Sequence, residues 1–402
     1  MKNKGRTVFV IGAGFSAPAN LPIQNRILRE ITQPTSTDFL SFDPDPESLK
    51  LMLSFNRVGL YLLQNYTKVD CTEDNIKFSG LERDIVLPNT DPIQQNNTFR
   101  EIQMQRESIR SKLEAADLQI SLEDIFTSFD KSYQGKEYLY QKSYYQIDKV
   151  RDAITRLFVY YFSRRINSHS FDHQEYIDFC NFIKSQRSVT IISTNWDVLI
   201  EEYFTREKIS YNLCLNEPYF TPSSKIKENS SVVNLIKLHG SINWFKCLNC
   251  GTLNIVDNKK CGRFLFDDSA DETCAQCHCK ASNEPLLQAE IITPTMMKTI
   301  NSQLYNNLWS AAKRDLMKAS SVTFVGYSLP VADFELRYLL QRSIPSEATI
   351  DIVLHHSDNP ENTDASSLKS LLPEKRYRDL FAKNEMNFFY EGFNNYFSKT
   401  EK

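Results

Sequence analysis

Short apolar runs rich in β-branched and aromatic residues recur along the chain and predict the strands of a buried sheet. The first run spans residues 7–11 and is followed by a glycine-rich turn and a helical stretch to about Ile31. Comparable runs follow at Ser188–Ser193, Val232–His239, Ser321–Val325, Thr349–His355 and, more weakly, Asn387–Tyr390. Helical segments separate most of these strands, which is typical of an α/β fold with a largely parallel, Rossmann-like sheet.

Two stretches interrupt this pattern. Residues 34–187 contain no convincing strand, and segments such as Asn97–Leu118 and Tyr144–Ile166 have helical spacing, so a large helical insertion is predicted. Residues 246–284 hold six of the nine cysteines and few apolar side chains, which indicates a small module stabilised by metal rather than by burial. The predicted Rossmann-like domain therefore has three segments, 1–33, 188–245 and 285–402, interrupted by the helical insertion (34–187) and a zinc-ribbon module (246–284).

Composition excludes several classes of protein. The 402 residues carry a net charge of −3, so no overall positive field would attract nucleic acid. No apolar run reaches the roughly 18 residues that a membrane span requires. The cysteines are odd in number and four of them form Cys-x-x-Cys pairs, which favours a reducing compartment. We therefore expect a soluble cytoplasmic protein without membrane contact or direct nucleic-acid binding.

The paired cysteines form the most specific local motif. Cys247-x-x-Cys250 and Cys274-x-x-Cys277 have the spacing of two zinc knuckles, and four thiolates fill a tetrahedral zinc site. Because no coordination position stays open, the predicted zinc is structural rather than catalytic. An alternative stays open, in which one ligand is replaced by a neighbour in the sequence: Cys261, His278 or Cys279.

Gly12-x-Gly14-x-x-Ala17 follows the first predicted strand and opens a helix. In a nucleotide site the first glycine permits a tight turn, the second admits a pyrophosphate, and the helix N-terminus supplies amides. The alternative is a plain strand-to-helix turn. No second strand ending in an acidic residue follows, which argues against a dehydrogenase type of site.

Polar residues follow three further predicted strands, and ligands of open α/β sheets bind beyond such strand ends. Asn195 can position a water or a ribose hydroxyl and Asp197 can accept hydrogen bonds, although either could simply cap the next helix. His239 could act as a general base near pH 7, although a lone histidine is usually structural. Gly326 permits close approach of a ligand and Ser328 can bind a phosphate or ribose oxygen, the alternative being another turn.

Taken in order, Gly-Ala-Gly-x-Ser, Thr-Asn-x-Asp, Leu-His-Gly-Ser, the paired Cys-x-x-Cys and Gly-Tyr-Ser resemble the sirtuin family. The likeness is closer to the sirtuin-like NAD hydrolases of bacterial antiphage systems, and it covers about half of the chain. It implies a domain that binds NAD beside a small zinc-bearing module. It implies catalytic roles for Asn195, Asp197 and the base His239. It also implies NAD contacts from Gly12, Ala13, Gly14, Ser16, Thr194, Gly240, Ser241, Gly326, Ser328 and Asp333.

The sequence departs from the sirtuin deacylases at two segments. Their Gly-Ile-Pro-Asp-Phe-Arg segment corresponds here to Asn20–Asn25, which keeps only the proline, and their Phe-Gly-Glu of the acyl-lysine cleft corresponds to Ile291–Thr295. In addition, Trp196 replaces the usual isoleucine. The sequence keeps the Asn and His of the sirtuin motifs but lacks the two segments that form the protein-substrate groove of the deacylases. This combination favours cleavage of NAD by water, giving nicotinamide and ADP-ribose. The alternatives are an NAD-dependent protein deacylase and a non-catalytic nucleotide-binding sensor subunit.

The same resemblance implies an effector of antiviral defence that depletes NAD (abortive infection) and is held inactive until triggered. Only about 50 residues follow the strand at Thr349–Leu354, too few for a sensing domain of ordinary size. They include the aromatic run Phe388–Phe397, which could instead pack on the last strand. Detection is therefore expected from the helical insertion, from homo-oligomerisation or from a partner in trans. The first candidate partner is a HerA-like hexameric ATPase, and the second is a short Argonaute-type protein.

Overall fold

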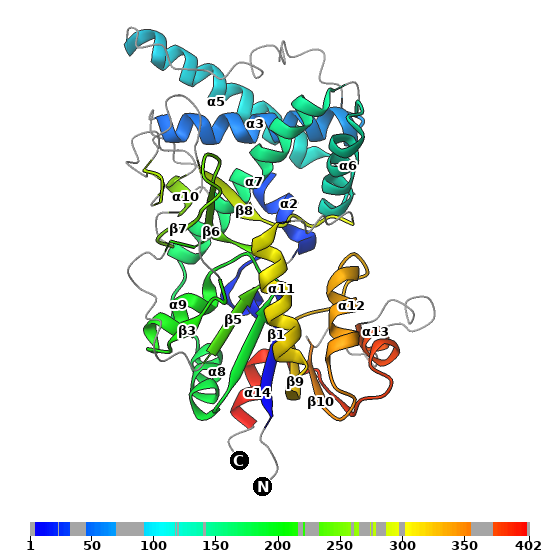
Figure 1. The fold of residues 1–402 in the computed structure, drawn as a ribbon. Helices are drawn as coiled ribbons and strands as arrows, with labels where there is room; N and C mark the ends of the chain where they lie inside the picture. Colours follow the sequence, from blue (N-terminus) through cyan, green and yellow to red (C-terminus); the bar gives the residue numbers. More distant parts are fainter. Residues whose placement is uncertain are drawn as a thin grey trace.

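The computed structural model describes residues 5–22, 24–32, 46–69, 92–116, 118, 120–139, 142–215, 220–221, 233–258, 261–264, 274, 276–278, 287–296, 302–354 and 373–399. Two sheets and a group of long helices make up this part of the chain (Figure 1). None of the helices in these ranges combines the length and apolarity that a membrane crossing needs.

A seven-stranded sheet, parallel in every pairing, forms the lower part of the molecule in Figure 1. Its central strands are short and rich in β-branched residues; β2 is buried throughout and β5 is buried except at Asn234, as expected for a parallel sheet covered on both faces. The spatial order is β11 (Met386–Phe389), β10 (Thr349–Val353), β9 (Ala319–Val325), β1 (Arg6–Ile11), β2 (Val189–Ser193), β5 (Val233–Lys237) and β3 (Tyr211–Asn212). The predicted strands and the Rossmann-like fold class are thus confirmed.

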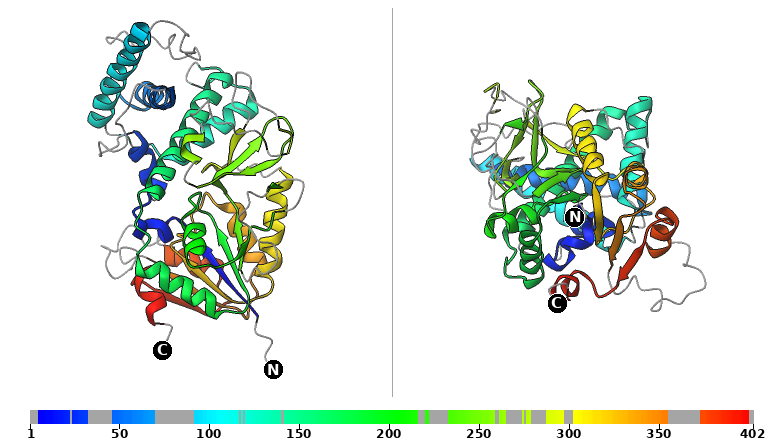
Figure 2. Two further views of the ribbon diagram at one scale, coloured as in Figure 1. Left: turned by 90° about the vertical axis from the view of Figure 1, so that its left-hand side faces the viewer. Right: turned by 60° about the horizontal axis from the view of Figure 1, so that its bottom comes forward.

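Helices cover both faces of this sheet (Figure 2). Phe9 of β1 packs edge-on against Phe179 and also contacts Phe397, on the face covered by α8 (Gln174–Ser185), α9 (Leu199–Arg206) and α14 (Phe393–Lys399). Phe324 of β9 pairs in register with Val10, so it points away from Phe9, and it packs on Tyr377. The helices beyond this opposite side are α11 (Gln303–Leu316), α12 (Phe334–Ser343) and α13 (Pro373–Leu380).

A group of long helices lies above the sheet in Figure 1. Its members are α2 (Gln24–Thr32), α3 (Pro46–Tyr66), α5 (Pro92–Ala115), α6 (Leu122–Gly135) and α7 (Tyr144–Asn167). A capping box starts α7, because Ser143 Oγ accepts from the Gln146 amide and the Gln146 side chain accepts from the Ser143 amide. Within the described part of residues 34–187 no strand occurs, so the helical insertion is confirmed. Its predicted range also contains α8, which packs on the sheet instead.

A second, four-stranded sheet stands beside the insertion. It has the order β4 (Phe220–Thr221), β7 (Leu253–Ile255), β6 (Gly240–Cys247) and β8 (Leu287–Ile291), and the short helix α10 (Cys261–Phe264) follows β7. β6 runs antiparallel to both β7 and β8. The cysteine-rich module therefore uses strand residues from both sides of its predicted range of 246–284.

Two local predictions are wrong. The helix expected from the glycine turn to Ile31 is broken into α1 (Ala13–Ser16), the 3-10 turn η1 (Ala17–Ala19) and α2, because Asn20 takes a left-handed conformation and Pro22 follows it. The strand β6 was not expected at all. Only two residues separate it from β5, so the apolar pattern shows no loop, and the turn depends on Gly240 at a φ of 76°.

Strand order brings the sequence motifs together. β1 lies between β2 and β9, and the chain adds β2 and β5 on one side before it returns to add β9 and β10 on the other. The carboxyl ends of β1, β2, β5 and β9 therefore meet at one edge around the point where the order reverses. Such a switch point is where ligands bind in open α/β sheets.

The contact between the loops after β1 and β9 can be tested with two glycines. Both Gly326 and Gly392 have positive φ, of 60° and 75°, but a Cβ at Gly326 would lie 2.3 Å from the Gly14 carbonyl carbon, whereas nothing lies within 4 Å at Gly392. We expect Gly392→Ala to lower the free energy of unfolding by about 1–2 kcal/mol through left-handed strain alone. Gly326→Ala should lower it by roughly 1–3 kcal/mol more, because two backbones must separate. Urea unfolding measures both, and equal losses would contradict the close contact.

Candidate active site

The loop after β1 is held against the loop after β9 by backbone contact. The amide of Gly14 donates to the Gly326 carbonyl at 2.9 Å, and that of Gly12 donates to the Val325 carbonyl at 3.1 Å. A Cβ at Gly14 would lie 2.7 Å from the Gly326 Cα, so this contact requires glycine. The close approach that the sequence predicted for a pyrophosphate is thus used here by a second loop of the protein.

Four predicted site residues form one buried hydrogen-bonded group. The side-chain amide of Asn195 donates to the Gly12 carbonyl and to Ser16 Oγ, each at 3.0 Å. Ser16 Oγ in turn donates to Asp197 Oδ2 at 2.8 Å. The other carboxylate oxygen of Asp197 accepts from the amide of Leu199, the first residue of α9, at 3.0 Å. The loop after β2 is therefore fixed to the glycine loop. The N-cap of α9 is Val198, so neither Asn195 nor Asp197 occupies the predicted capping position.

The buried ammonium group of Lys237 also holds the loop after β2. Lys237 Nζ donates to the carbonyl of Asp197, to Glu201 Oε1 at 2.7 Å and to Ser241 Oγ at 2.8 Å, and its side chain is fully buried. Burial raises the pKa of the Asp197 and Glu201 carboxyls, and the charge of Lys237 opposes that rise. All three ammonium protons have acceptors, which is the condition for burying such a charge.

His239 occupies the two-residue turn between β5 and β6. Its ring Nδ1 lies 3.1 Å from the Thr194 carbonyl, and its own carbonyl accepts from the Ile292 amide. A carbonyl only accepts, so Nδ1 carries a proton and Nε2 is the nitrogen that can take one up. Nε2 lies 3.8 Å from Asp333 Oδ1, and both side chains are buried. Asp333, predicted on the adenosine side, thus lies against the predicted base.

The remaining predicted ligand residues lie around this cluster in different settings. Thr194 Oγ1 donates to the Ile11 carbonyl at 3.2 Å, and a Cβ at Gly240 would lie 2.2 Å from the Glu290 carbonyl oxygen, so both serve the packing of strand ends. Ser328 is exposed and Ala13 is half-buried. The first three motif loops and Asp333 are therefore in mutual contact, while Ser328 faces outward.

Trp196 connects the site to both neighbouring units. Its indole Nε1 donates to the Ile292 carbonyl at 3.0 Å, just beyond β8, and its ring stacks on Phe158 of α7 with centroids 5.9 Å apart. The sequence marked this position only as a departure from the sirtuin pattern. Its direct neighbour Asn195 therefore sits where the parallel sheet, the second sheet and the insertion meet.

Four cysteines gather at one end of the second sheet, as the spacing predicted. The Sγ atoms of Cys247, Cys250, Cys274 and Cys277 all lie within 4.8 Å of one another, and two of the pairs are 3.5 and 3.7 Å apart. With Zn–S bonds of about 2.3 Å, the edges of a tetrahedron are about 3.8 Å, so these thiols fit a zinc ion. Closed four-sulfur coordination would hold the two knuckles together and leave no position for chemistry.

The alternative ligands lie elsewhere or outside the described residues. Cys261 is buried and directs its thiol to the Asn258 carbonyl, and burial raises its pKa to about 11. His278 is exposed and is not part of the four-sulfur group. Cys279 lies outside the described residues. Cys261 and His278 are thus not ligands in this arrangement.

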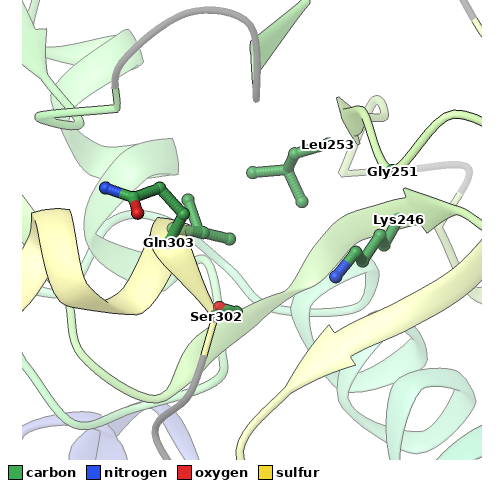
Figure 3. A pocket seen from close by; sticks show the side chains of 6 residues that line it. Lys246, Gly251, Leu253, Ser302 and Gln303 are labelled. Atoms are coloured by element: carbon green, nitrogen blue, oxygen red, sulfur yellow. The ribbon is translucent and has the colours of Figure 1, made fainter.

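A small hollow opens between the second sheet and the start of α11 (Figure 3). It is lined by Lys246, Gly251, Leu253, Ser302, Gln303 and Leu304, and its volume is about 40 Å³. Ligand pockets commonly span roughly 300–1,000 Å³. The hollow is therefore too small for a nucleotide, and it lies apart from the residues around His239.

The zinc prediction can be tested by substitution within and beside the cluster. We expect close to one zinc per purified wild-type chain by elemental analysis, and loss of most of that metal together with thermal destabilisation in Cys274→Ser. Cys261→Ser is the matched control, a buried cysteine near the cluster that should keep its zinc. A metal-free wild-type chain, or zinc lost equally from both variants, would contradict the assignment.

Comparison with known proteins gives one family match. Residues 189–374, somewhat less than half of the chain, match the family model of the SIR2-like domain. That range begins with β2 and contains the Asn195, His239 and cysteine motifs as well as Asp333. A search of curated proteins found no match.

Solved structures of sirtuins are similar to the chain only at a low level. One, described as the structural basis for the mechanism and regulation of Sir2 enzymes, is 11% identical with a TM-score of 0.35, covering 99% of this chain and 90% of its own. A Sir2 mutant with a deacetylated p53 peptide and 3'-O-acetyl ADP-ribose is 13% identical with a TM-score of 0.36, covering 98% and 91%. The likeness to a known family therefore rests on the family model: residues 189–374 are similar to the SIR2-like domain.

Proposed function

We propose that the protein is an NAD hydrolase that cleaves the bond between nicotinamide and ribose. The observation that carries the proposal is the convergence of Asn195, His239 and the glycine loop at the carboxyl edge of the parallel sheet. The edge lies at the switch point of the strand order, where dinucleotides bind in Rossmann-like folds. The SIR2-like match over residues 189–374 supports NAD as the nucleotide.

In the proposed reaction, a water oxygen bonds to the ribose carbon while the carbon–nitrogen bond breaks. The bonding electrons move to the pyridinium nitrogen, so nicotinamide leaves as a neutral molecule, and the water loses a proton. His239 is the base that takes this proton at Nε2, because Nδ1 already donates to the Thr194 carbonyl. The products are nicotinamide, ADP-ribose and a proton released to solvent.

Asn195 is the proposed positioning group for the water or the ribose diol. Both protons of its side-chain amide are directed to Gly12 and Ser16, so the amide orientation is fixed. The side-chain oxygen is then the acceptor that can hold a substrate hydroxyl or the water. The resemblance implied a catalytic role for Asp197, but its carboxylate holds Ser16 and the first turn of α9. We therefore assign Asp197 a positioning role.

Water is favoured over an acyl-lysine by the surroundings of residues 292–296. The resemblance to deacylases places their acyl-lysine cleft at this segment. Here the insertion is bonded to it: Arg151 Nη2 of α7 donates to Thr293 Oγ1 at 3.3 Å, and Thr127 Oγ1 of α6 accepts from the Met296 amide at 3.0 Å. Because α6 and α7 are bonded to this segment, they occupy the side on which a peptide substrate would have to bind.

The proposal is tested by NAD cleavage in two variants, with His173→Ala as the histidine control. Loss of a general base lowers the rate by roughly 10²–10⁴-fold, so His239→Ala should fall in that range, and Asn195→Ala should be similarly impaired. The double variant should lose less than the product of the two losses, because both groups act on one transition state. His173 is half-buried at the start of α8 and should be dispensable.

The alternative functions give different results in the same assay. A deacylase releases nicotinamide only when an acetylated peptide is present, and a non-catalytic sensor binds NAD without releasing nicotinamide. Nicotinamide release by folded His239→Ala at the wild-type rate would contradict the proposed base. Peptide-dependent release by the wild-type chain would favour the deacylase.

We further infer that the protein acts as a defence effector controlled by a partner in trans, the HerA-like ATPase before the short Argonaute-type protein. The aromatic tail is packed, because Phe393 and Phe397 of α14 contact α8, and Phe393 also contacts Phe15 of the glycine loop. The tail is thus part of the domain core, which leaves the insertion, self-assembly or a partner in trans as the proposed source of detection.

This regulation is tested by light scattering after size-exclusion chromatography, combined with NAD assays. We expect the chain to form a homo-oligomer with little activity alone, and to gain activity with the product of the neighbouring gene. Full activity of an isolated monomer would contradict the control by a partner.

A further inference from the structure

We propose that Asp333 is a positioning residue for the base, holding the imidazole of His239 and balancing the charge that the ring acquires. The catalytic consequence rests on the proposed NAD hydrolysis, whereas the pairing itself does not. The resemblance to sirtuins implied instead that Asp333 contacts NAD on its adenosine side. The assignment comes from the two buried side chains that meet across the loops after β5 and β9.

Each nitrogen of the His239 ring faces an oxygen that can only accept. The Thr194 carbonyl lies 3.1 Å from Nδ1, and Asp333 Oδ1 lies 3.8 Å from Nε2. The proton on Nδ1 bonds to the Thr194 carbonyl, whereas the separation of Nε2 and Oδ1 is beyond hydrogen-bond distance, so Asp333 acts on the ring through its charge. The nearby carboxylate favours the charged form of the ring, and the burial of His239 opposes it.

Asp333 is itself held from the opposite side. Tyr327 Oη donates to Asp333 Oδ2 at 2.9 Å, and burial raises the pKa of that phenol, which stays a donor. The Asp333 carbonyl accepts from the Arg337 amide at the first turn of α12. The carboxylate oxygen Oδ1 is thus directed at His239 by two bonds that do not involve the histidine.

Other charged groups occur on the elements packed around the ring. The loop after β2 carries Asp197, whose buried carboxyl interacts with Lys237 of β5, and Lys237 also pairs with Glu201 of α9. Glu290 of β8 interacts with Lys246, and Arg337 of α12 lowers the pKa of Tyr327 by its charge. The paired charges largely offset one another at a distance. Asp333 is placed to act on His239 directly.

The proposed chemistry gives this pair a defined task. When Nε2 of His239 takes the proton of the attacking water, a positive charge forms on the ring 3.8 Å from a fixed carboxylate. Asp333 stays ionised throughout and takes no proton. A carboxylate already in place stabilises that charge without reorganisation, which is how preorganised groups lower a barrier.

The first experiment follows the protonation of the His239 ring by NMR in the full-length protein, using labelled histidine and His239→Gln to assign the signal. Removing an opposite charge at this distance lowers the midpoint of a histidine titration by about one pH unit or more, which is the expected effect of Asp333→Asn. The matched control is Asp351→Asn. Asp351 also accepts from a tyrosine hydroxyl, that of Tyr396, but it lies on β10 and bonds to Asn387 instead.

Unchanged midpoints in Asp333→Asn, or equal shifts in both variants, would overturn the pairing. If Asp333→Asn fails to fold, Tyr327→Phe is the second test. It removes the hydroxyl that shares the carboxylate charge, so the His239 midpoint should rise. A fall or an unchanged midpoint would then count against the proposal.

The second experiment measures NAD cleavage against pH. Because the carboxylate favours the charged ring, the acid limb of the wild-type profile should lie at higher pH than that of Asp333→Asn. In Asp333→Asn the acid limb should move to lower pH by the same amount as the NMR midpoint. The plateau rate should fall about tenfold for each pH unit of that shift. If the NMR midpoint shifts in Asp333→Asn but the wild-type protein does not cleave NAD, the pairing of Asp333 with His239 is supported and the proposed function is refuted. Cleavage with an unmoved limb refutes the role of Asp333.

Discussion

The burial of one ammonium group constrains the arrangement of the whole site. Lys237 has no water around it, so each of its protons must find an acceptor inside the protein. Those acceptors come from the loop after β2, from α9 and from the start of β6. Removing Lys237 would leave Glu201 as a buried charge without compensation, which is more destabilising than losing an exposed pair. One side chain thereby fixes the loop of Asn195 to the turn of His239.

The same turn is where the chain leaves the parallel sheet for the second one. His239 ends the link between β5 and β6, and its carbonyl is bonded to Ile292 just beyond β8. The four cysteines lie at the far end of β6, so a zinc ion there would clamp the second sheet without approaching the base. Metal and base thus act on opposite ends of one strand, which separates stability of the module from chemistry at the edge.

The order of motifs at strand ends predicted most of the site because parallel strands place their carboxyl ends at one edge. That logic located Asn195 and His239, and cysteine spacing alone located the thiol cluster. It could not locate Lys237 or Asp333 in their roles, because both depend on side chains brought together from distant segments. It also missed β6, because only a two-residue turn separates it from β5 and the apolar pattern runs on across that turn. The sequence showed Trp196 only as a departure from the isoleucine of the sirtuin pattern. Its contacts with α7 and with the residue after β8 could not be foreseen, because these partners come from separate units.

The position of Trp196 limits how the insertion can influence the site. Phe158 and Phe162 of α7 pack on its ring, and its indole nitrogen is bonded to Ile292. Asn195, its neighbour, has its amide protons fixed by the glycine loop. A shift of α7 cannot therefore move Trp196 freely. It must either break the Ile292 bond or pull on a backbone that Lys237 also holds. Control through the insertion would thus require a discrete rearrangement of this tryptophan rather than a gradual drift, since packed cores switch between arrangements rather than deform continuously.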